Sequence, residues 1–412
     1  MENTDKKSRV LVLGINFSPE LTGIGKYTGE MVDWLSDQGY ECAMVTSFPY
    51  YPNWKVQAPY SGKWFKTEKS KGNKMVVYRC PFYVPANPSG LKRIIHEASF
   101  FASAFITVNK LLFKPGYDRI ICIAPPFHLG FLAWYYKLFK GGKINYHIQD
   151  MQIEAARDLK VVKSELVFKI LFGLERWILK RMNSISSISV GMIRKIKAKT
   201  GRDLIMIPNW VDTDKFKPIE DRASLKPKWG FDAKHKVVLY SGSIGEKQGL
   251  DALIDIAANL SAYGEIRFVI CGTGPYKAKL EEMVKLKQLK NISFLPLQGN
   301  DVFNEFLNFA DVHLVLQKAE AADLVMPSKL TTILSCGGLA IATSFPGTGL
   351  YDVIHEHDMG ILIDPENSVQ LQEAIVKACS GDYGKQKVNA RAYAEKYLNR
   401  DAILGQMCKD IL

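Results

Sequence analysis

The chain has 412 residues, too many for one ordinary hydrophobic core, so two or three domains are expected. Hydrophobic residues make up 47% of the chain and charged residues 23%, which argues against a disordered chain and a coiled coil. The seven cysteines are scattered and include no Cys-x-x-Cys pair, which argues against a disulfide framework and a zinc site.

Positive charge is concentrated in the first half of the chain. Residues 1–205 hold 31 lysines and arginines against 16 aspartates and glutamates, a net charge of +15, whereas the remainder carries −3. The basic half is expected to meet phosphates or an anionic surface, although solubility alone would also tolerate this bias. No nucleic-acid partner is expected.

The sequence indicates neither a secretory signal nor a membrane span. The first ten residues, MENTDKKSRV, are polar and lead into a strand-like run. The uncharged stretch Ile120–Tyr136 is interrupted by Pro125, Pro126 and His128, which suits a strand, a turn and the start of a helix. A cytoplasmic protein is expected, peripheral on the inner face of the cell membrane.

Short apolar runs alternate with segments of helical periodicity along the chain, the pattern of parallel α/β folding. In the first half, strands are expected at Val10–Ile15, Glu41–Thr46, Met75–Tyr78, Arg119–Ile123, Ile144–Ile148 and Ile185–Ile188. In the second half, strands are expected at Val237–Tyr240, Arg267–Ile270, Ile292–Leu295, Val312–Leu316, Leu339–Ala342 and Ile361–Ile363. Two doubly wound units are implied.

We expect the two units to join near the Pro-containing stretch Ile207–Pro218. The domains are therefore predicted as 1–206, 207–382 and a final pair of helices, 383–412, that packs back on the N-terminal domain.

Two helical segments of the first half combine apolar and basic residues. Glu165–Arg181 places its charged residues on a narrow stripe among Leu, Ile, Phe, Val and Trp, and Leu91–Phe113 is similar. A helix lying in a membrane interface has this composition, and so does a helix packed under a sheet. Both interpretations stay open.

The first candidate ligand loop runs from Gly14 through Gly23 and Gly25 into a helix. Glycines allow a ligand to approach the backbone, and amides at a helix start can meet phosphate or sugar oxygens. A tight turn without a ligand would also explain the glycines. The spacing does not match the Gly-x-Gly-x-x-Gly dinucleotide motif.

Two further glycine-rich loops follow strands of the second unit. The first, Gly242–Gly249, contains Ser243 and Lys247 and could hold a diphosphate. In the second, Gly272 and Gly274 would leave room for a nucleobase or ribose, although a simple turn explains them equally well.

A segment between the two units carries a family resemblance. Pro208-Asn-Trp-Val-Asp212, followed by Phe216-x-Pro218, resembles the interdomain segment of family 4 of the retaining GT-B glycosyltransferases. Gly14–Met31, Tyr240–Leu250 and Pro327-Ser-Lys-Leu330 resemble its branch of colanic-acid fucosyltransferases and exopolysaccharide enzymes. The resemblance implies an α/β GT-B fold, two Rossmann-like parallel-sheet domains facing across a cleft, with no metal. Asp212 and Asp214 are accordingly interpreted as turn-capping residues.

The resemblance also assigns the segment from Glu320 to Gly337 to the donor. The family has two glutamates here, but Leu324 and Thr332 occupy those positions, so Asp323 is the nearest carboxylate to the first. Thr332 could bond a ribose hydroxyl. Pro327, Ser328 and Lys329 are expected to hold the donor phosphates, with Lys247 as a second base or only a surface lysine.

Three residues after strands of the first half are candidates for catalysis. His128 could bond a hydroxyl of the donor sugar, and Asp150, with Glu154 nearby, could orient the acceptor or share its proton. Helix-capping roles for His128 and Asp150 remain alternatives.

The resemblance implies a retaining, metal-independent glycosyltransferase that uses a nucleotide-sugar donor, with a GDP-sugar such as GDP-fucose favoured over a UDP-sugar. The expected acceptor is a polyprenyl-diphosphate-linked saccharide of exopolysaccharide or capsule biosynthesis, held near an anionic membrane surface. Two alternatives stay open: a nucleotide-sugar 2-epimerase and a non-catalytic nucleotide-sugar-binding scaffold.

Overall fold

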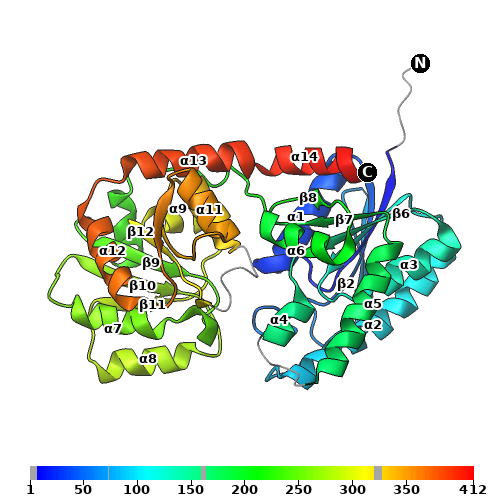
Figure 1. Cartoon of the computed structure of the whole chain (residues 1–412), viewed down its shortest axis with the longest axis horizontal. Helices are drawn as coiled ribbons and strands as arrows, with labels where there is room; N and C mark the ends of the chain where they lie inside the picture. The colour runs from blue at the N-terminus through cyan, green and yellow to red at the C-terminus, as the bar shows by residue number, and fades with distance from the viewer. Residues whose placement is uncertain (1–6, 73, 159–163, 320–326) are drawn as a thin grey trace, which may run out of the picture. The chain divides into compact units, whose positions relative to one another are not determined.

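A computed structural model describes residues 7–72, 74–158, 164–319 and 327–412 of the chain (Figure 1). The chain divides into two compact units. The first comprises residues 1–208 with 404–412, and the second comprises residues 209–403. Each unit has its own parallel sheet, which confirms the expected α/β class with two Rossmann-like domains.

The first unit is built on an eight-stranded sheet in the order β3-β4-β2-β1-β5-β6-β7-β8, with only β3 antiparallel to its neighbour. Its strands are β1 (Arg9–Leu13), β2 (Glu41–Ser47), β3 (Lys66–Ser70), β4 (Met75–Cys80), β5 (Arg119–Ala124), β6 (Lys143–Ile148), β7 (Ser184–Ser187) and β8 (Ile205–Met206). Its helices are α1 (Gly23–Asp37), α2 (Gly90–Leu112), α3 (Leu129–Lys140), α4 (Gln152–Asp158), α5 (Glu165–Arg181) and α6 (Val190–Thr200).

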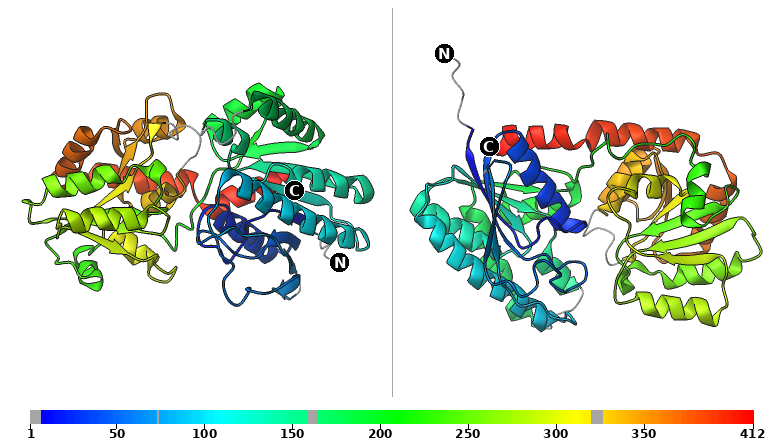
Figure 2. Two further views of the ribbon diagram at one scale, coloured as in Figure 1. Left: turned by 90° about the horizontal axis from the view of Figure 1, so that it is seen from below. Right: turned by 180° about the vertical axis from the view of Figure 1, so that it is seen from behind.

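One face of this sheet is covered by α2, α3 and α5. Phe100 of α2, Tyr136 of α3 and Ile178 of α5 are buried in one hydrophobic core with Leu11 and Ile120 of the sheet. Helix α3 contacts both α2 and α5, and the three appear side by side, cyan to green, in Figure 2. Among the described residues, no helix is long and apolar enough to cross a membrane.

The second unit is built on a six-stranded parallel sheet in the order β11-β10-β9-β12-β13-β14. Its strands are β9 (Lys236–Ser241), β10 (Ile266–Cys271), β11 (Ile292–Leu295), β12 (Val312–Val315), β13 (Leu339–Thr343) and β14 (Gly360–Ile363). Its helical segments are η1 (Ala223–Trp229), η2 (Glu246–Gln248), α7 (Asp251–Asn259), α8 (Lys277–Leu286), α9 (Phe303–Asn308), α10 (Lys329–Ser335), α11 (Gly349–Glu356), α12 (Ser368–Ser380) and α13 (Gly384–Tyr397), and α14 (Arg400–Ile411) follows.

Two hydrophobic cores lie on opposite faces of the second sheet. Because side chains alternate along a strand, Val238 and Tyr240 of β9 face α7, α8 and α12, whereas Val237 and Leu239 face α9, α10, α11 and α13. The sheet is therefore buried on both faces, as parallel sheets are.

The last helices are divided between the two units. Helix α13 packs on α10, and Arg391 donates from one nitrogen to the carbonyls of Phe216 (2.9 Å) and Ser335 (2.8 Å). Of the segment 383–412, which we expected to pack as a whole on the first unit, only residues from Leu404 onward belong to that unit.

All twelve expected strands are present, and the structure adds two at the edges of the first sheet. Strand β3 has the sequence KTEKS and no buried residue, and β8 has two residues. Neither shows the apolar pattern from which strands are predicted.

Candidate functional site

In the second unit, two of the predicted donor motifs meet at the C-terminal end of β9. The Nζ atom of Lys329 lies 3.7 Å from the ring centre of Tyr240. A Cβ atom placed on Gly242 would lie 3.0 Å from this nitrogen. Strands β9 and β12 are neighbours in the sheet although β10 and β11 lie between them in the chain, and such a switch point is where α/β sheets bind ligands.

The ammonium group of Lys329 is buried, and none of the described residues forms an ion pair with it. Its Nζ atom is shielded from solvent and has no hydrogen-bond partner among the described residues. Burial lowers the pKa of Lys329 to about 7, because desolvation penalises the charged form. The Tyr240 ring offers a cation–π attraction of about 0.5–2 kcal/mol, which replaces only part of the lost hydration. Such a cation is suited to an anionic ligand.

Tyr240 joins this lysine to the glycine-rich loop, although the sequence suggested no role for it. Its hydroxyl donates to the backbone carbonyl of Ser243 at 2.7 Å, and its ring lies against Lys329. The side chain of Ser243 is exposed. From hydrophobic periodicity alone, a tyrosine in a strand is predicted to be a core residue. Its contacts with Lys329 and Ser243 therefore could not be predicted.

The loops after β9 and β10 are held together by their backbones. The amide of Gly242 donates to the carbonyl of Cys271 at 2.9 Å. A Cβ atom on Gly272 would lie 1.9 Å from the Gly242 carbonyl oxygen, and one on Gly274 would lie 2.1 Å from the Ile244 carbonyl oxygen. Both glycines are therefore required for contact between the loops, and a ligand is not needed to explain them. Their predicted role in donor binding stays a prediction.

The remaining residues of the Pro327 segment are described by their surroundings. Pro327 is buried and Ser328 is exposed at the start of α10. The hydroxyl of Thr332 donates to the backbone carbonyl of Lys329 at 3.0 Å, and its side chain is buried. That hydroxyl proton is thus used within the helix, which leaves Thr332 its acceptor capacity.

Two predicted residues lie outside the described part of the structure: Asp323 entirely, and Lys247 in its side chain. Within the described residues, no group of three His, Cys, Asp or Glu side chains could hold a metal ion. Asp212 accepts from the amides of Asp214 (3.2 Å) and Lys215 (3.0 Å), the geometry of a turn cap.

The loop before α1 contains a buried carboxylate. Glu20 is 6% exposed and accepts from the amides of Tyr50 and Tyr51, both at 3.0 Å. A Cβ atom on Gly25 would lie 2.4 Å from Oε2 of Glu20, whereas one on Gly23 would meet nothing within 4 Å. Gly25 therefore makes room for Glu20. The Glu20 carboxylate thus lies beside Gly25, and the contact of Gly23 and Gly25 with phosphate stays a prediction.

His128 and Asp150 follow β5 and β6, which are neighbouring strands, so both lie at the C-terminal edge of the first sheet. Burial lowers the pKa of His128 to about 4, so its imidazole is neutral at physiological pH. Its Nε2 atom is buried and has no hydrogen-bond partner among the residues that the structure places. One nitrogen of the ring therefore keeps its hydrogen-bonding capacity unused among these residues.

Glu154, also a candidate for catalysis, is engaged in a buried ion pair. Its carboxylate contacts the ammonium group of Lys199 on α6, and Lys199 also pairs with Glu175 on α5 at 2.9 Å. These contacts connect α4 to α5 and α6. A structural role explains Glu154 without catalysis, and the sequence spacing gave no sign of the partner lysine.

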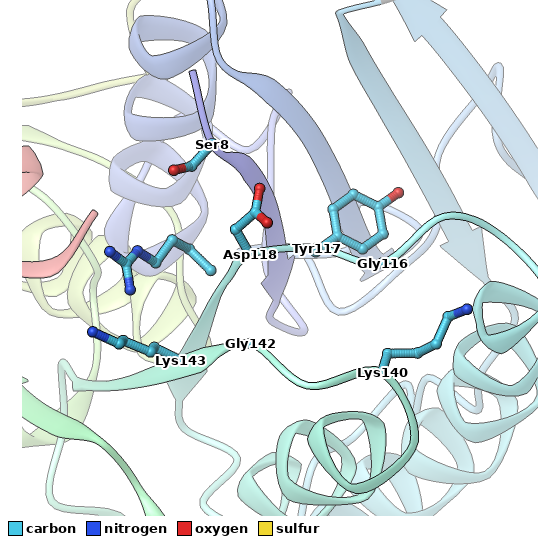
Figure 3. A pocket seen from close by; sticks show the side chains of 8 residues that line it. Ser8, Gly116, Tyr117, Asp118, Lys140, Gly142 and Lys143 are labelled. Carbon is cyan, nitrogen blue, oxygen red and sulfur yellow. The ribbon is translucent and has the colours of Figure 1, made fainter. Parts of the chain in front are cut away.

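An open pocket of about 670 Å³ lies at the other end of the first sheet (Figure 3). It lies where β1, β5 and β6 begin, whereas His128 and Asp150 lie where β5 and β6 end. The pocket is therefore separate from the candidate site. It is lined by Ser8, Gly116, Tyr117, Asp118, Arg119, Lys140, Gly142 and Lys143.

Comparison with known proteins gives consistent results. The family model "Glycosyl transferases group 1" matches residues 221–397. The chain is 38% identical to the putative colanic acid biosynthesis glycosyl transferase WcaI of Escherichia coli K12, covering 98% of this chain and 99% of that protein. Similar solved structures include sucrose-phosphate synthase of Thermosynechococcus elongatus (TM-score 0.73, 16% identity, 98% of both chains) and Anabaena HepE in complex with UDP and glucose (0.71, 15%, 98% and 99%).

The contact between the two glycine loops generates a stability prediction. Replacing Gly272 with alanine should lower the free energy of unfolding of the second unit by about 1–3 kcal/mol, because the new Cβ atom must displace the Gly242 carbonyl. Gly264→Ala is the matched control, since a Cβ atom there meets nothing within 4 Å, and a change within about 0.5 kcal/mol is expected. Urea denaturation measures both. Equal stabilities of the two variants would contradict the close approach.

Proposed function

The chain belongs to the group 1 glycosyltransferases of the GT-B fold, and from this premise we propose that Lys329 neutralises the diphosphate of its nucleotide-sugar donor. Cleavage of the bond between sugar and phosphate leaves negative charge on the nucleoside diphosphate. A cation already fixed and shielded from water stabilises this charge more than a solvated one would. The buried ammonium group of Lys329, with which no residue that the structure places is paired, is the observation that carries the proposal.

The proposed reaction proceeds with retention and without a metal. Lys329, held against Tyr240 beside Gly242, supplies positive charge where a metal ion would otherwise be needed. His128 is proposed to bond a hydroxyl of the transferred sugar through its unpaired Nε2, and Asp150 to orient the acceptor.

The proposed donor is GDP-fucose or a related GDP-deoxyhexose, and the proposed acceptor is a polyprenyl-diphosphate-linked saccharide. The motif resemblance to colanic-acid fucosyltransferases supports the donor. The 38% sequence identity, over 98% of the chain, to an enzyme named for colanic acid biosynthesis supports a role in exopolysaccharide synthesis. The structure of HepE with UDP keeps UDP-sugars as the competing donors to be tested.

The first unit carries a surface suited to an anionic membrane, the setting of a lipid-linked acceptor. Helices α2, α3 and α5 expose a set of large apolar side chains: Leu91, Ile94, Ile95, Phe105, Ile106, Leu138, Phe139, Leu166, Val167, Ile170 and Leu174. Exposed basic residues of α2 and α5 are Lys92, Arg93, Lys110, Lys169, Arg176 and Lys180, whereas Glu165 is the one exposed carboxylate of these three fully described helices. Apolar side chains with basic neighbours are typical of interfacial helices.

The phosphate assignment predicts a pH-dependent affinity. Phosphate favours the charged form of Lys329, whose pKa without ligand is about 7. Binding above pH 7 must therefore take up a proton, and the affinity for GDP should fall between about pH 7.5 and about pH 9.5, approaching about tenfold per pH unit. Lys329→Gln should bind GDP at least about tenfold more weakly at pH 7.5 and lose this pH dependence. Isothermal titration calorimetry measures both effects.

Lys377→Gln, at an exposed position of α12, is the control and should bind like the wild type. A thermal-shift panel of GDP, UDP, dTDP and ADP identifies the base, with the largest shift expected for GDP. Unchanged affinity and pH dependence in Lys329→Gln would remove this lysine from the phosphate site.

The apolar and basic surface of α2, α3 and α5 predicts that the protein sediments with anionic vesicles. Phe105 of α2 and Phe139 of α3 are 40% and 63% exposed, and both rings contact Tyr135 (5.2 and 5.1 Å between centres). Replacing both with glutamine should weaken binding to phosphatidylglycerol-containing vesicles at least about tenfold, because two apolar side chains no longer enter the interface. Val388→Gln, on the second unit, is the control. Equal binding to uncharged phosphatidylcholine vesicles would contradict the role of the basic residues.

A further inference from the structure

A half-buried carboxylate on α2, that of Glu97, has no role in the chemistry proposed above. Glu97 is half-buried, and desolvation raises its pKa. Its Oε1 atom accepts a hydrogen bond from Nε2 of Gln152 at 2.6 Å. A carboxylate that is partly removed from water costs stability unless it is hydrogen-bonded, and the side-chain amide of Gln152 supplies that bond.

The side chain of Gln152 makes a second hydrogen bond, to the turn that contains His128. Oε1 of Gln152 accepts from the backbone amide of Phe127 at 3.3 Å, and Phe127 immediately precedes His128. Because Nε2 of Gln152 is directed at the Glu97 carboxylate, Oε1 of the same amide is directed at Phe127. Glu97 therefore sets the orientation of the group that holds this turn.

The same turn of α2 also contacts the imidazole ring of His128. Phe101, four residues after Glu97, has its ring centre 5.3 Å from that of His128 in an edge-to-face arrangement. The backbone of Glu97 interacts with the imidazole as well and partly offsets the effect of burial on the pKa of His128. One side of α2 thus holds both the backbone before His128 and the ring itself.

We propose that Glu97 is a positioning residue for glycosyl transfer, which through Gln152 fixes the Phe127–His128 turn and presents Nε2 of His128 to a sugar hydroxyl. The inference rests on the proposed contact between His128 and the sugar. Without the Glu97–Gln152 hydrogen bond, only the ring of Phe101 and backbone contacts would hold the imidazole of His128, and the ring could rotate. Misplacement of a catalytic group by about 1 Å can lower a reaction rate about a hundredfold.

The test compares Glu97→Leu with Glu97→Gln in the full chain. Glutamine retains an oxygen that can accept from Gln152, whereas leucine removes the acceptor at similar volume. Histidine NMR titration should show the pKa of His128 near 4 in the wild type and Glu97→Gln, and shifted toward about 6.5 in Glu97→Leu as the ring loses its fixed buried place. His147, buried in β6 with a pKa lowered to about 4, reports on the fold of the same unit and should not move.

The kinetic arm measures release of GDP from GDP-fucose in the presence of a lipid-linked saccharide acceptor. Glu97→Leu should lower kcat at least tenfold with unchanged GDP affinity, and Glu97→Gln should retain at least half of kcat. An unmoved His128 titration, or a moved one with unchanged kcat, overturns the proposal. If the wild type releases no GDP, the donor assignment fails, and the titration alone then decides whether Glu97 positions His128.

Discussion

The candidate donor site depends on one energetic cost, the removal of the Lys329 ammonium group from water, which the contact with the ring of Tyr240 offsets only in part. Desolvation lowers the pKa of this lysine to about 7, and no described residue donates or accepts a hydrogen bond at its Nζ atom. Natural proteins bury unpaired charges mainly where a ligand supplies the partner. A diphosphate would do so here, and the energy of binding would offset the cost of burial.

The loops beside that cation are held to each other by backbone contacts. Gly272 and Gly274 allow the loop after β10 to touch the loop after β9, and the Tyr240 hydroxyl bonds the carbonyl of Ser243. The geometry at Lys329 is thus fixed by residues that need not touch a donor. Pre-organisation of this kind makes a fixed charge effective in catalysis, because no reorganisation is needed as the leaving group forms.

The fold could be predicted from the sequence almost completely, because parallel strands buried on both faces produce strong apolar runs. Strand β3 was not predicted, because an exposed edge strand needs no apolar residues. The candidate site was predicted less well. Lys329 and Gly242 were recognised as separate motifs, whereas the role of Tyr240 depends on two contacts that sequence spacing does not encode. Glu154 was proposed for catalysis because it follows the end of a strand, and its contact with Lys199, which is distant in the sequence, could not be predicted from spacing. The contact of Gly25 with a ligand stays a prediction, and its close approach to Glu20 could not be predicted from the spacing of the glycines.

The central claim is tested most directly by NMR titration of the Lys329 side chain, labelled with carbon-13 at Cε and assigned with the glutamine variant. Without ligand the pKa should lie near 7, and saturating GDP should raise it to about 10 or above, because an adjacent phosphate favours the charged form. A pKa near that of an ordinary lysine in the unliganded chain, or one that GDP leaves unchanged, would contradict the account.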